Sequence, residues 1–223
     1  FAGSKKVFPV FQPYITSFCS HRDDQKYEQE NGLLSQWRGY GGGEGRYAIV
    51  FDTVELEKRL AVEHTNFEYS SLRILHTLYD TDDFDFETYF RLIIQKFGED
   101  CLRLVQELPV EISSPSEIVD ELLPGATRFK HQGFKEECEI RIVACPMHQA
   151  FEDETKRHSA DKKLKLKSTK PRLVRTSGKS EVEYIELFRS QDEDLPIRRI
   201  IVGPSFNQNE AYRFAMEVAG TSI

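Results

Sequence analysis

The sequence predicts an α+β protein with a mixed, mainly antiparallel (split) β-sheet and flanking helices. Three observations predict this class: apolar runs of strand length, one long stretch of helical periodicity, and an irregular alternation of strand and helix signals. The 223 residues, 39% of them hydrophobic, suffice for a sizeable core. We therefore expect one domain over residues 1–223, with a basic loop or insertion at residues 152–180. Because the chain begins at Phe1 rather than Met, we also expect that an N-terminal segment precedes it.

The first elements are short. Gln12–Ser20 contains the run Tyr14-Ile15-Thr16-Ser17-Phe18-Cys19 and is expected to be a strand, and the polar stretch Arg22–Asn31 is expected to be a loop. Leu33–Tyr40 predicts a short helix or turn, which the following glycines end. Tyr47–Phe51 is a continuous apolar run, which predicts a strand buried on both faces.

Helical signals dominate the next part of the chain. Asp52 and Glu55 have the spacing of a capping box, which predicts a helix over about Val54–Val62. The periodicity of Tyr69–Tyr79 fits either a strand or a helix. Apolar residues recur every three or four positions through Phe86–Leu108, which predicts the longest helix of the chain.

The last part of the chain returns to strands. Apolar and charged residues alternate within Phe134–Cys145, which predicts a strand with two different faces. Asn207 and Glu210 form a second capping-box pattern ahead of the final helix. The remaining elements that we expect are two strands and this helix: Val182–Phe188, Ile197–Val202 and about Gln208–Ala219.

Three charged residues alternate along the strand expected over Phe134–Cys145. On a strand, Glu137, Glu139 and Arg141 project from one face, with successive positions roughly 6–7 Å apart. Such a row can hold a ribose hydroxyl, stabilise an oxocarbenium-like centre or orient a nucleophile. The alternative is an exposed sheet face that carries an ordinary Glu–Arg pair.

The only tryptophan lies in an aromatic cluster beside a glycine-rich loop. Trp37 and Tyr40 could stack on a nicotinamide or a nucleobase, and Arg38 could contact a phosphate. The alternative is that Trp37 fills the core and Arg38 covers it. The glycine run that follows has no Walker or dinucleotide-binding pattern.

A basic block, Lys156–Lys179, carries ten Lys or Arg and a single acid. The block therefore carries a net charge of +9. Because the whole chain has a net charge of −7, the residues outside the block carry −7 − 9 = −16. Such a block can contact a nucleic acid, a nucleotide or an acidic partner, and the alternative is a solvated loop. The residues that we expect to contact an anion or nucleic acid are Lys162, Lys163, Lys165, Lys167, Arg172 and Arg175.

Other features argue against further classes. The four cysteines form no CxxC pair, and no Cys/His set has zinc-finger spacing, so we expect no metal site. No apolar run approaches the roughly 20 residues that a membrane span needs. The start of the sequence has no signal-peptide pattern. We therefore expect a cytoplasmic protein that does not associate with a membrane.

Motifs spread over most of the chain, from about Tyr14 to Ala219, resemble those of a large, uncharacterised bacterial family described as a domain of unknown function. The resemblance implies a relative in fold rather than an activity. The motifs, in order, are Phe18-Cys19-Ser20, Leu34-x-x-Trp37-x-x-Tyr40, Ala48-Ile49-Val50-Phe51, Lys130-His131, Phe134-x-x-Glu137-x-Glu139-x-Arg141 and Ile200-Ile201-Val202-Gly203-Pro204.

The pattern is also similar, more distantly, to the ADP-ribosyltransferase superfamily. Those enzymes carry a strand with Gln/Glu-x-Glu, whose second acid engages the nicotinamide-side ribose of NAD, and Glu137-x-Glu139 matches that motif. A middle strand carries Ser or Tyr beside the nicotinamide, and Ser17 or Ser20 could match it. The first motif, a strand with His or Arg that grips the cofactor, has no match here and would lie upstream of Phe1.

This similarity implies an ADP-ribosyltransferase-like domain of a bacterial toxin or phage-defence protein. It would use NAD either for transfer to a protein or nucleic-acid acceptor or for NAD hydrolysis, and a partner chain could belong to the same system. The alternative is a non-catalytic sensor or interaction module of a defence system, which binds a nucleotide or nucleic acid through the basic block. The implied roles are transition-state stabilisation by Glu139, acceptor orientation by Glu137, and cofactor binding by Ser17, Ser20, Trp37, Arg38, Tyr40 and Arg141.

Overall fold

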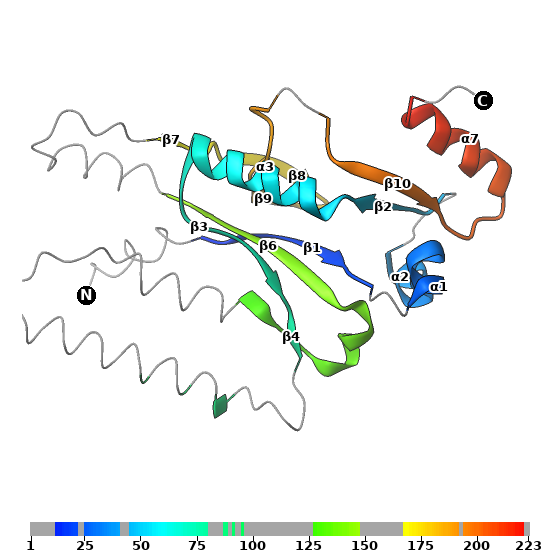
Figure 1. Ribbon diagram of the computed structural model, residues 1–223, viewed down its shortest axis with the longest axis horizontal. Helices are drawn as coiled ribbons and strands as arrows, with labels where there is room; N and C mark the ends of the chain where they lie inside the picture. The colour runs from blue at the N-terminus through cyan, green and yellow to red at the C-terminus, as the bar shows by residue number, and fades with distance from the viewer. Residues whose placement is uncertain are drawn as a thin grey trace, which may run out of the picture. The chain divides into compact units, whose positions relative to one another are not determined.

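The structure is a computed structural model that describes residues 12–21, 25–40, 45–79, 87–88, 91, 95, 127–147, 167–191 and 194–220. Helices combine with small, mostly antiparallel sheets (Figure 1), which confirms the α+β class. The chain divides into two compact units, and each is made from two pieces of sequence. Unit 1 comprises Phe1–Phe18 and Ala61–Arg189, and unit 2 comprises Cys19–Leu60 and Ser190–Ile223. The single domain over residues 1–223 stays a prediction.

Unit 1 is built on a four-stranded sheet with the strand order β1-β6-β3-β7. Strands β3 and β6 pair antiparallel, from Tyr69 opposite Pro146 to His76 opposite Ile140, whereas β3 and β7 pair parallel. The residues of β6 from Ile142 to its end are all buried, so this pair forms the core of the unit. Most of Tyr69–Tyr79, whose periodicity fitted either a strand or a helix, therefore belongs to strand β3. The four strands are β1 (Tyr14–Cys19), β3 (Phe67–His76), β6 (Glu139–Pro146) and β7 (Ser168–Thr169).

Short elements complete unit 1. The strand expected over Phe134–Cys145 begins only at Glu139, because Cys138 adopts a left-handed conformation (φ 44°, ψ 49°) that ends a 3-10 helix. The strand expected over Val182–Phe188 lies a few residues earlier. These elements are the parallel pair β4 (Leu78–Tyr79) and β5 (Phe129–Lys130), the 3-10 helix η3 (Gln132–Glu137), and the hairpin strands β8 (Leu173–Ser177) and β9 (Ser180–Tyr184).

Only part of the helix expected over Phe86–Leu108 lies within the described residues. Glu87, Thr88, Arg91 and Gln95 are helical, and Arg91 pairs with Glu87 one turn earlier. The rest of this prediction falls outside the described residues. Among the helices that the structure describes, none is long and apolar enough to cross a membrane.

Helix α3 (Thr53–Asn66) begins where the capping pattern predicted and runs farther than expected. The Asp52 carboxylate accepts hydrogen bonds from the backbone amides of Val54 and Glu55, both at 3.1 Å. These bonds satisfy amide groups that have no partner within the first turn of a helix.

A buried carboxylate near the end of α3 ties several segments of unit 1 together. Glu63 is fully buried, and its carboxylate accepts hydrogen bonds from the Lys170 ammonium, from the Tyr69 hydroxyl at 2.8 Å and from the Phe188 amide at 3.0 Å. The Lys170 ammonium also lies 4.0 Å from the centre of the Phe67 ring. One member of the basic block is thus an internal ion-pair partner rather than a surface cation.

The described part of unit 2 contains a two-stranded antiparallel sheet, the first part of α3 and three further helices. The hydroxyl of Tyr47 donates to the Ala211 carbonyl at 3.2 Å, and the centres of the Tyr47 and Phe214 rings are 5.7 Å apart. Helix α7 therefore packs on strand β2. The prediction of a strand buried on both faces is wrong, since Ile49 is 52% exposed on this narrow sheet. The elements are α1 (Lys26–Asn31), α2 (Leu34–Tyr40), β2 (Tyr47–Phe51), β10 (Ile197–Val202) and α7 (Gln208–Val218).

The region expected to be a loop, Arg22–Asn31, contains helix α1. This helix ends where Gly32, in a left-handed conformation (φ 74°), donates its amide to the Glu28 carbonyl at 2.7 Å. The helix has no buried residue, and for this reason hydrophobic periodicity gives no sign of it.

Two glycines make room for the indole ring of Trp37, which is 8% exposed. A Cβ atom at Gly32 would lie 2.8 Å from the ring, and one at Gly203 would lie 2.7 Å from it. The indole nitrogen donates to the Asn31 carbonyl at 2.8 Å. This arrangement favours the interpretation that Trp37 fills the core.

The Glu63–Lys170 pair can be compared with a surface pair on the same helix, Glu55–Lys58. Lys170→Met leaves a buried carboxylate without its cation, so we expect the free energy of unfolding to fall by about 3–5 kcal/mol. Lys58→Met, at an exposed position, should leave the free energy of unfolding unchanged. Urea denaturation of both variants measures the difference, and equal losses would contradict a buried ion pair.

The glycine cradle of Trp37 gives a second stability prediction. Gly203→Ala should lower the free energy of unfolding by about 1–3 kcal/mol, because its methyl group overlaps the indole ring. In contrast, Gly39→Ala in α2 meets open space and should be neutral or stabilise the protein by up to about 1 kcal/mol. Urea denaturation followed by the fluorescence of Trp37 measures both changes. A neutral Gly203→Ala would show that the ring is not held this closely.

Candidate functional site

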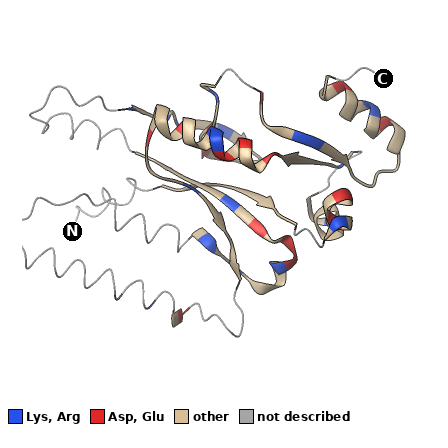
Figure 2. Ribbon diagram, in the orientation of Figure 1, with Lys and Arg blue, Asp and Glu red and all other residues tan. Residues whose placement is uncertain are grey.

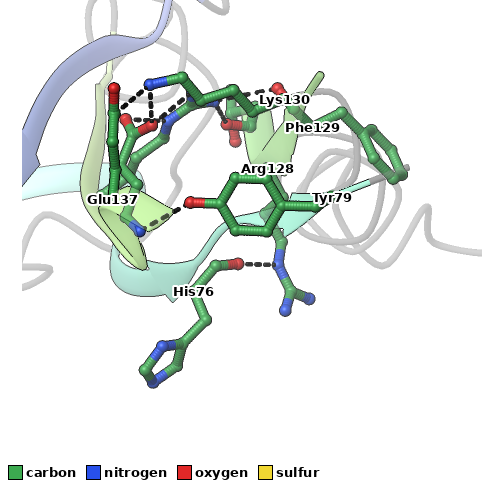
Figure 3. A network of polar contacts seen from close by, with 9 residues as sticks. His76, Tyr79, Arg128, Phe129, Lys130 and Glu137 are labelled. Carbon is green, nitrogen blue, oxygen red and sulfur yellow. Dashed lines mark hydrogen bonds and ion pairs between the residues drawn. The ribbon is translucent and has the colours of Figure 1, made fainter. Parts of the chain in front are cut away.

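Charged residues lie where η3 leads into β6 (Figure 2), and the side chains of Lys130 and Glu137 meet there (Figure 3). Glu139, the first residue of β6, is only 4% exposed. Its carboxylate accepts hydrogen bonds from Arg141, at 2.8 Å from Nε and 3.3 Å from Nη2. The Lys130 ammonium lies 2.8 Å from the second carboxylate oxygen. The predicted acid is therefore buried and pairs with two cations.

The second predicted acid reaches the same place by a different route. Glu137 was expected on one strand face with Glu139, but it is the last residue of η3, and the left-handed turn at Cys138 separates the two acids. Its carboxylate nevertheless lies 2.5 Å from the Lys130 ammonium. The two carboxylates are therefore brought together by a shared cation rather than by the repeat of a strand.

Arg141 anchors this cluster to the backbone. Its Nη1 donates to the carbonyl of Thr127 and, at 3.5 Å, to that of Phe129, the first residue of β5. With two of its nitrogens on Glu139 and one on the backbone, the guanidinium is held in a single orientation. Arg141 thus bonds to Glu139 and to the backbone, and its expected contact with a cofactor stays a prediction.

Backbone hydrogen bonds hold the same strand end from the side of β4. The Glu139 amide donates to the Tyr79 hydroxyl at 2.8 Å, and the Thr77 amide donates to the Glu139 carbonyl at 2.9 Å. Nearby, Arg128 donates to the His76 carbonyl at 2.8 Å (Figure 3). The position of Glu139 is thus fixed through both its main chain and its side chain.

Ser17 belongs to this site as well. It lies on β1, the strand next to β6, and its side chain is close enough to Glu139 to help lower the pKa of that carboxyl group. Ser17 is exposed, whereas Glu139 is buried. The structure therefore brings together four of the expected site residues in unit 1: Ser17, Glu137, Glu139 and Arg141.

The network sets the charge state of Glu139. Burial alone would raise its pKa, but hydrogen bonds from Arg141, Lys130 and Ser17 outweigh burial and lower the pKa to about 2. For Lys130, burial favours the neutral amine, but hydrogen bonds to Glu137 and Glu139 outweigh it and raise the pKa of Lys130. Both groups are therefore ionised at neutral pH. A carboxylate in this state can stabilise positive charge or accept hydrogen bonds, but it cannot supply a proton.

The other residues expected to bind a cofactor belong to unit 2. Trp37 is buried in the core described above. Arg38 and Tyr40, on the last turn of α2, are exposed. Ser20 follows β1 and is half-buried. Their contacts with a cofactor stay predictions.

The basic block is only partly described. Lys162, Lys163 and Lys165 lie outside the described residues. The Lys167 ammonium donates to the His64 carbonyl at 2.8 Å, and the exposed Arg175 lies 5.9 Å from the centre of the Tyr184 ring. Arg172 is half-buried, and its Nη2 has no hydrogen-bond partner among the described residues. Contact of this block with an anion stays a prediction.

Sequence reasoning assigned no role to two members of the network, Lys130 and Tyr79. Lys130 appeared only as part of the Lys130-His131 motif, and Tyr79 only as the end of an undecided segment. Their partners are distant in sequence or depend on the turn at Cys138, so spacing along the chain gave no signal for either. Among the described residues, no group of three or more His, Cys, Asp or Glu could hold a metal ion.

The low pKa of Glu139 predicts how stability depends on pH. Its pKa falls from 4.5 to about 2 on folding, so its ionised form stabilises the fold. This contribution, about 3 kcal/mol, is complete above about pH 5 and is lost as the pH falls towards 2. The stability difference between the wild type and Glu139→Gln should shrink by that amount over this range, as measured by urea denaturation.

Glu186→Gln is the matched control, because Glu186 pairs with Arg189 at the surface of the same unit. Its stability difference from the wild type should change little with pH. A difference between wild type and Glu139→Gln that stays constant from pH 6 to pH 2 would contradict a depressed pKa for Glu139.

Comparison with known proteins found no match among the curated proteins and none among the solved structures. One family model matches residues 36–142, just under half of the chain. The matched range includes Tyr79, Lys130, Glu137, Glu139 and Arg141, whereas Ser17 precedes it. The expected resemblance to an uncharacterised domain family is therefore confirmed, and the similarity to ADP-ribosyltransferases stays a prediction. Over residues 36–142, this chain matches the family described as "Protein of unknown function (DUF2971)".

Proposed function

We propose that this chain is an ADP-ribosyltransferase-like domain that cleaves the nicotinamide–ribose bond of NAD, with Glu139 as its central carboxylate. One observation carries the proposal: Ser17, on the strand next to Glu139, lies close enough for its side chain to lower the pKa of that carboxyl group. These residues belong to two separate motifs of the resemblance, one near the start of the sequence and one in its second half. Their meeting on neighbouring strands supports a shared role.

The charge state of Glu139 suits this chemistry. Nicotinamide is positively charged in NAD and leaves as a neutral base when the electron pair of the C1′–N bond moves to its ring nitrogen. The leaving group therefore needs no general acid, while the ribose develops oxocarbenium-like positive charge. A carboxylate with a pKa of about 2 stays ionised and can stabilise that charge, since the network holds it in place before the reaction.

The remaining roles follow from the same geometry. Ser17 is exposed beside the buried acid, so it marks the side from which a ribose hydroxyl could reach the carboxylate. Glu137 would orient the acceptor, whose nucleophilic atom bonds to C1′ and gives up its proton. If the acceptor is water, the products are ADP-ribose and nicotinamide. The roles of Ser20, Trp37, Arg38 and Tyr40 are not needed for the proposal.

The biological setting rests on the resemblance. We propose a bacterial toxin or phage-defence protein that acts in the cytoplasm, with a protein or nucleic-acid acceptor and a possible partner chain. The alternative is a non-catalytic module that binds a nucleotide or nucleic acid through the basic block. Lys170 would not contribute to such a surface, because it is buried against Glu63.

The test is turnover of NAD labelled in its adenylate part, with cell lysate as the source of acceptors. Glu139→Gln should lower label transfer and nicotinamide release by about 10²–10³-fold, as expected for losing a main electrostatic stabiliser. Ser17→Ala should lower both by about tenfold, because it removes one neutral hydrogen bond to the acid. Glu186→Gln, outside the site, should retain wild-type turnover.

Each variant is assayed at a temperature at which circular dichroism shows it folded, because Glu139 also stabilises the protein. Nicotinamide release without labelled acceptor would identify hydrolysis instead of transfer. Wild-type turnover by Glu139→Gln, or no NAD binding by the folded wild type in calorimetry, would contradict the proposal. If the folded wild type does not bind NAD, steeply salt-dependent binding of nucleic acid would favour the alternative, a non-catalytic binding module.

A further inference from the structure

The site contains two carboxylates and two cations, which differ in how they are held. Arg141 forms two hydrogen bonds with Glu139, and that pair is electrically neutral. Lys130 then joins Glu139 at 2.8 Å and Glu137 at 2.5 Å. The cluster therefore balances two carboxylates with two cations, and each cation has different anchors.

The polar contacts of Arg141 include the backbone, whereas those of the Lys130 ammonium are to side chains. The guanidinium of Arg141 is bonded to backbone carbonyls as well as to Glu139. The Lys130 ammonium contacts the two carboxylates and lies 4.7 Å from the centre of the Phe134 ring. Lys130 is 19% exposed at the side chain and Phe134 is 48% exposed, whereas Glu139 is only 3% exposed at the side chain. The lysine therefore lies on the more accessible side of the acids.

We propose that Lys130 is a displaceable internal cation, which occupies the subsite between Glu137 and Glu139 and must leave it before a cationic ligand group can bind there. A lysine suits this role because its ammonium is a point charge on a flexible four-carbon stem, which can swing away without altering the backbone. When it leaves, the subsite holds two carboxylates against Arg141 alone. The subsite then has a net negative charge and attracts a cation.

This inference rests on the proposed function where it names the ligand. In NAD the charged nicotinamide and the ribose that becomes cationic are the groups that would replace the ammonium, whereas reduced NADH has a neutral nicotinamide ring. Lys130 thus competes with the cofactor, and it neutralises the charge of the two acids when no cofactor is bound. The competition lowers apparent affinity by the fraction of molecules in which Lys130 still occupies the subsite.

The first experiment needs no cofactor and tests whether the subsite accepts a separate cation. Lys130→Ala should lose thermal stability, and methylammonium chloride should restore it with a saturable dose dependence beyond that of sodium chloride. Lys58→Ala, which removes a lysine from an exposed pair, should show no such rescue. Lys130→Arg keeps the charge and should also be insensitive. If methylammonium fails to stabilise folded Lys130→Ala, the subsite does not exchange cations and the proposal is wrong.

The second experiment uses wild-type protein and so does not depend on a variant that folds. Limited acetylation of lysines, read by mass spectrometry, should modify Lys130 several times faster when NAD is present, and Lys58, from the exposed pair with Glu55, should serve as an internal reference with an unchanged rate. NADH should have a smaller effect. NAD that binds, as measured by calorimetry, without changing the acetylation rate of Lys130 would overturn the displacement.

Affinity completes the test and separates the two proposals. Lys130→Met removes the competing charge, so it should bind NAD about tenfold more tightly than wild type does, a gain in the range expected from freeing a charged site. Equal or weaker binding by folded Lys130→Met would overturn the role of Lys130. If neither protein binds NAD although methylammonium stabilises Lys130→Ala, the exchangeable subsite stands and the proposed NAD chemistry falls.

Discussion

The ion pair between Glu139 and Arg141 is the constraint on which unit 1 depends. Removing two charges from water is costly, and it is tolerated here because almost every polar atom of the pair has a partner. Through these partners the pair connects β1, the start of β6, and the segments that contain β4 and β5. The same contacts give Glu139 its charge state and its fixed position. The same hydrogen bonds therefore stabilise unit 1 and set the charge and position of Glu139 for the proposed chemistry.

The elements that sequence reasoning predicted well are those with local causes. The strand at Tyr47–Phe51, and the caps at Asp52 and Asn207, follow from short runs of residues and were confirmed. The errors have non-local or conformational causes. A left-handed residue at Cys138 turned half of an expected strand into a 3-10 helix, and a helix with no buried face, α1, left no periodic signal. Burial of a strand also depends on how many neighbours it has, which its own sequence does not contain.

The sequence indicated the acids of the site and Arg141, but not the second cation, Lys130. The Glu-x-Glu motif indicated Glu137 and Glu139, and the resemblance added Ser17, which lies beside Glu139. Lys130 was missed because any of the chain's lysines could have paired with these acids, and only the turn after η3 selects this one. For Trp37 the sequence left two interpretations open, and the close glycines favour the core. Residue type therefore indicated the chemistry, while the fold determined its partners.

The division of the chain into two discontinuous units has a consequence for how the protein is made. On the ribosome, all residues of unit 1 have been synthesised once Arg189 is added, whereas β2 of unit 2 must wait for β10, near the end of the chain. Until then β2 has an unpaired edge, which is a hazard for aggregation. Unit 1 can thus fold before the synthesis of unit 2 is complete. A nascent chain that stops before Ile197 would carry the complete acid cluster of the site but no partner for β2.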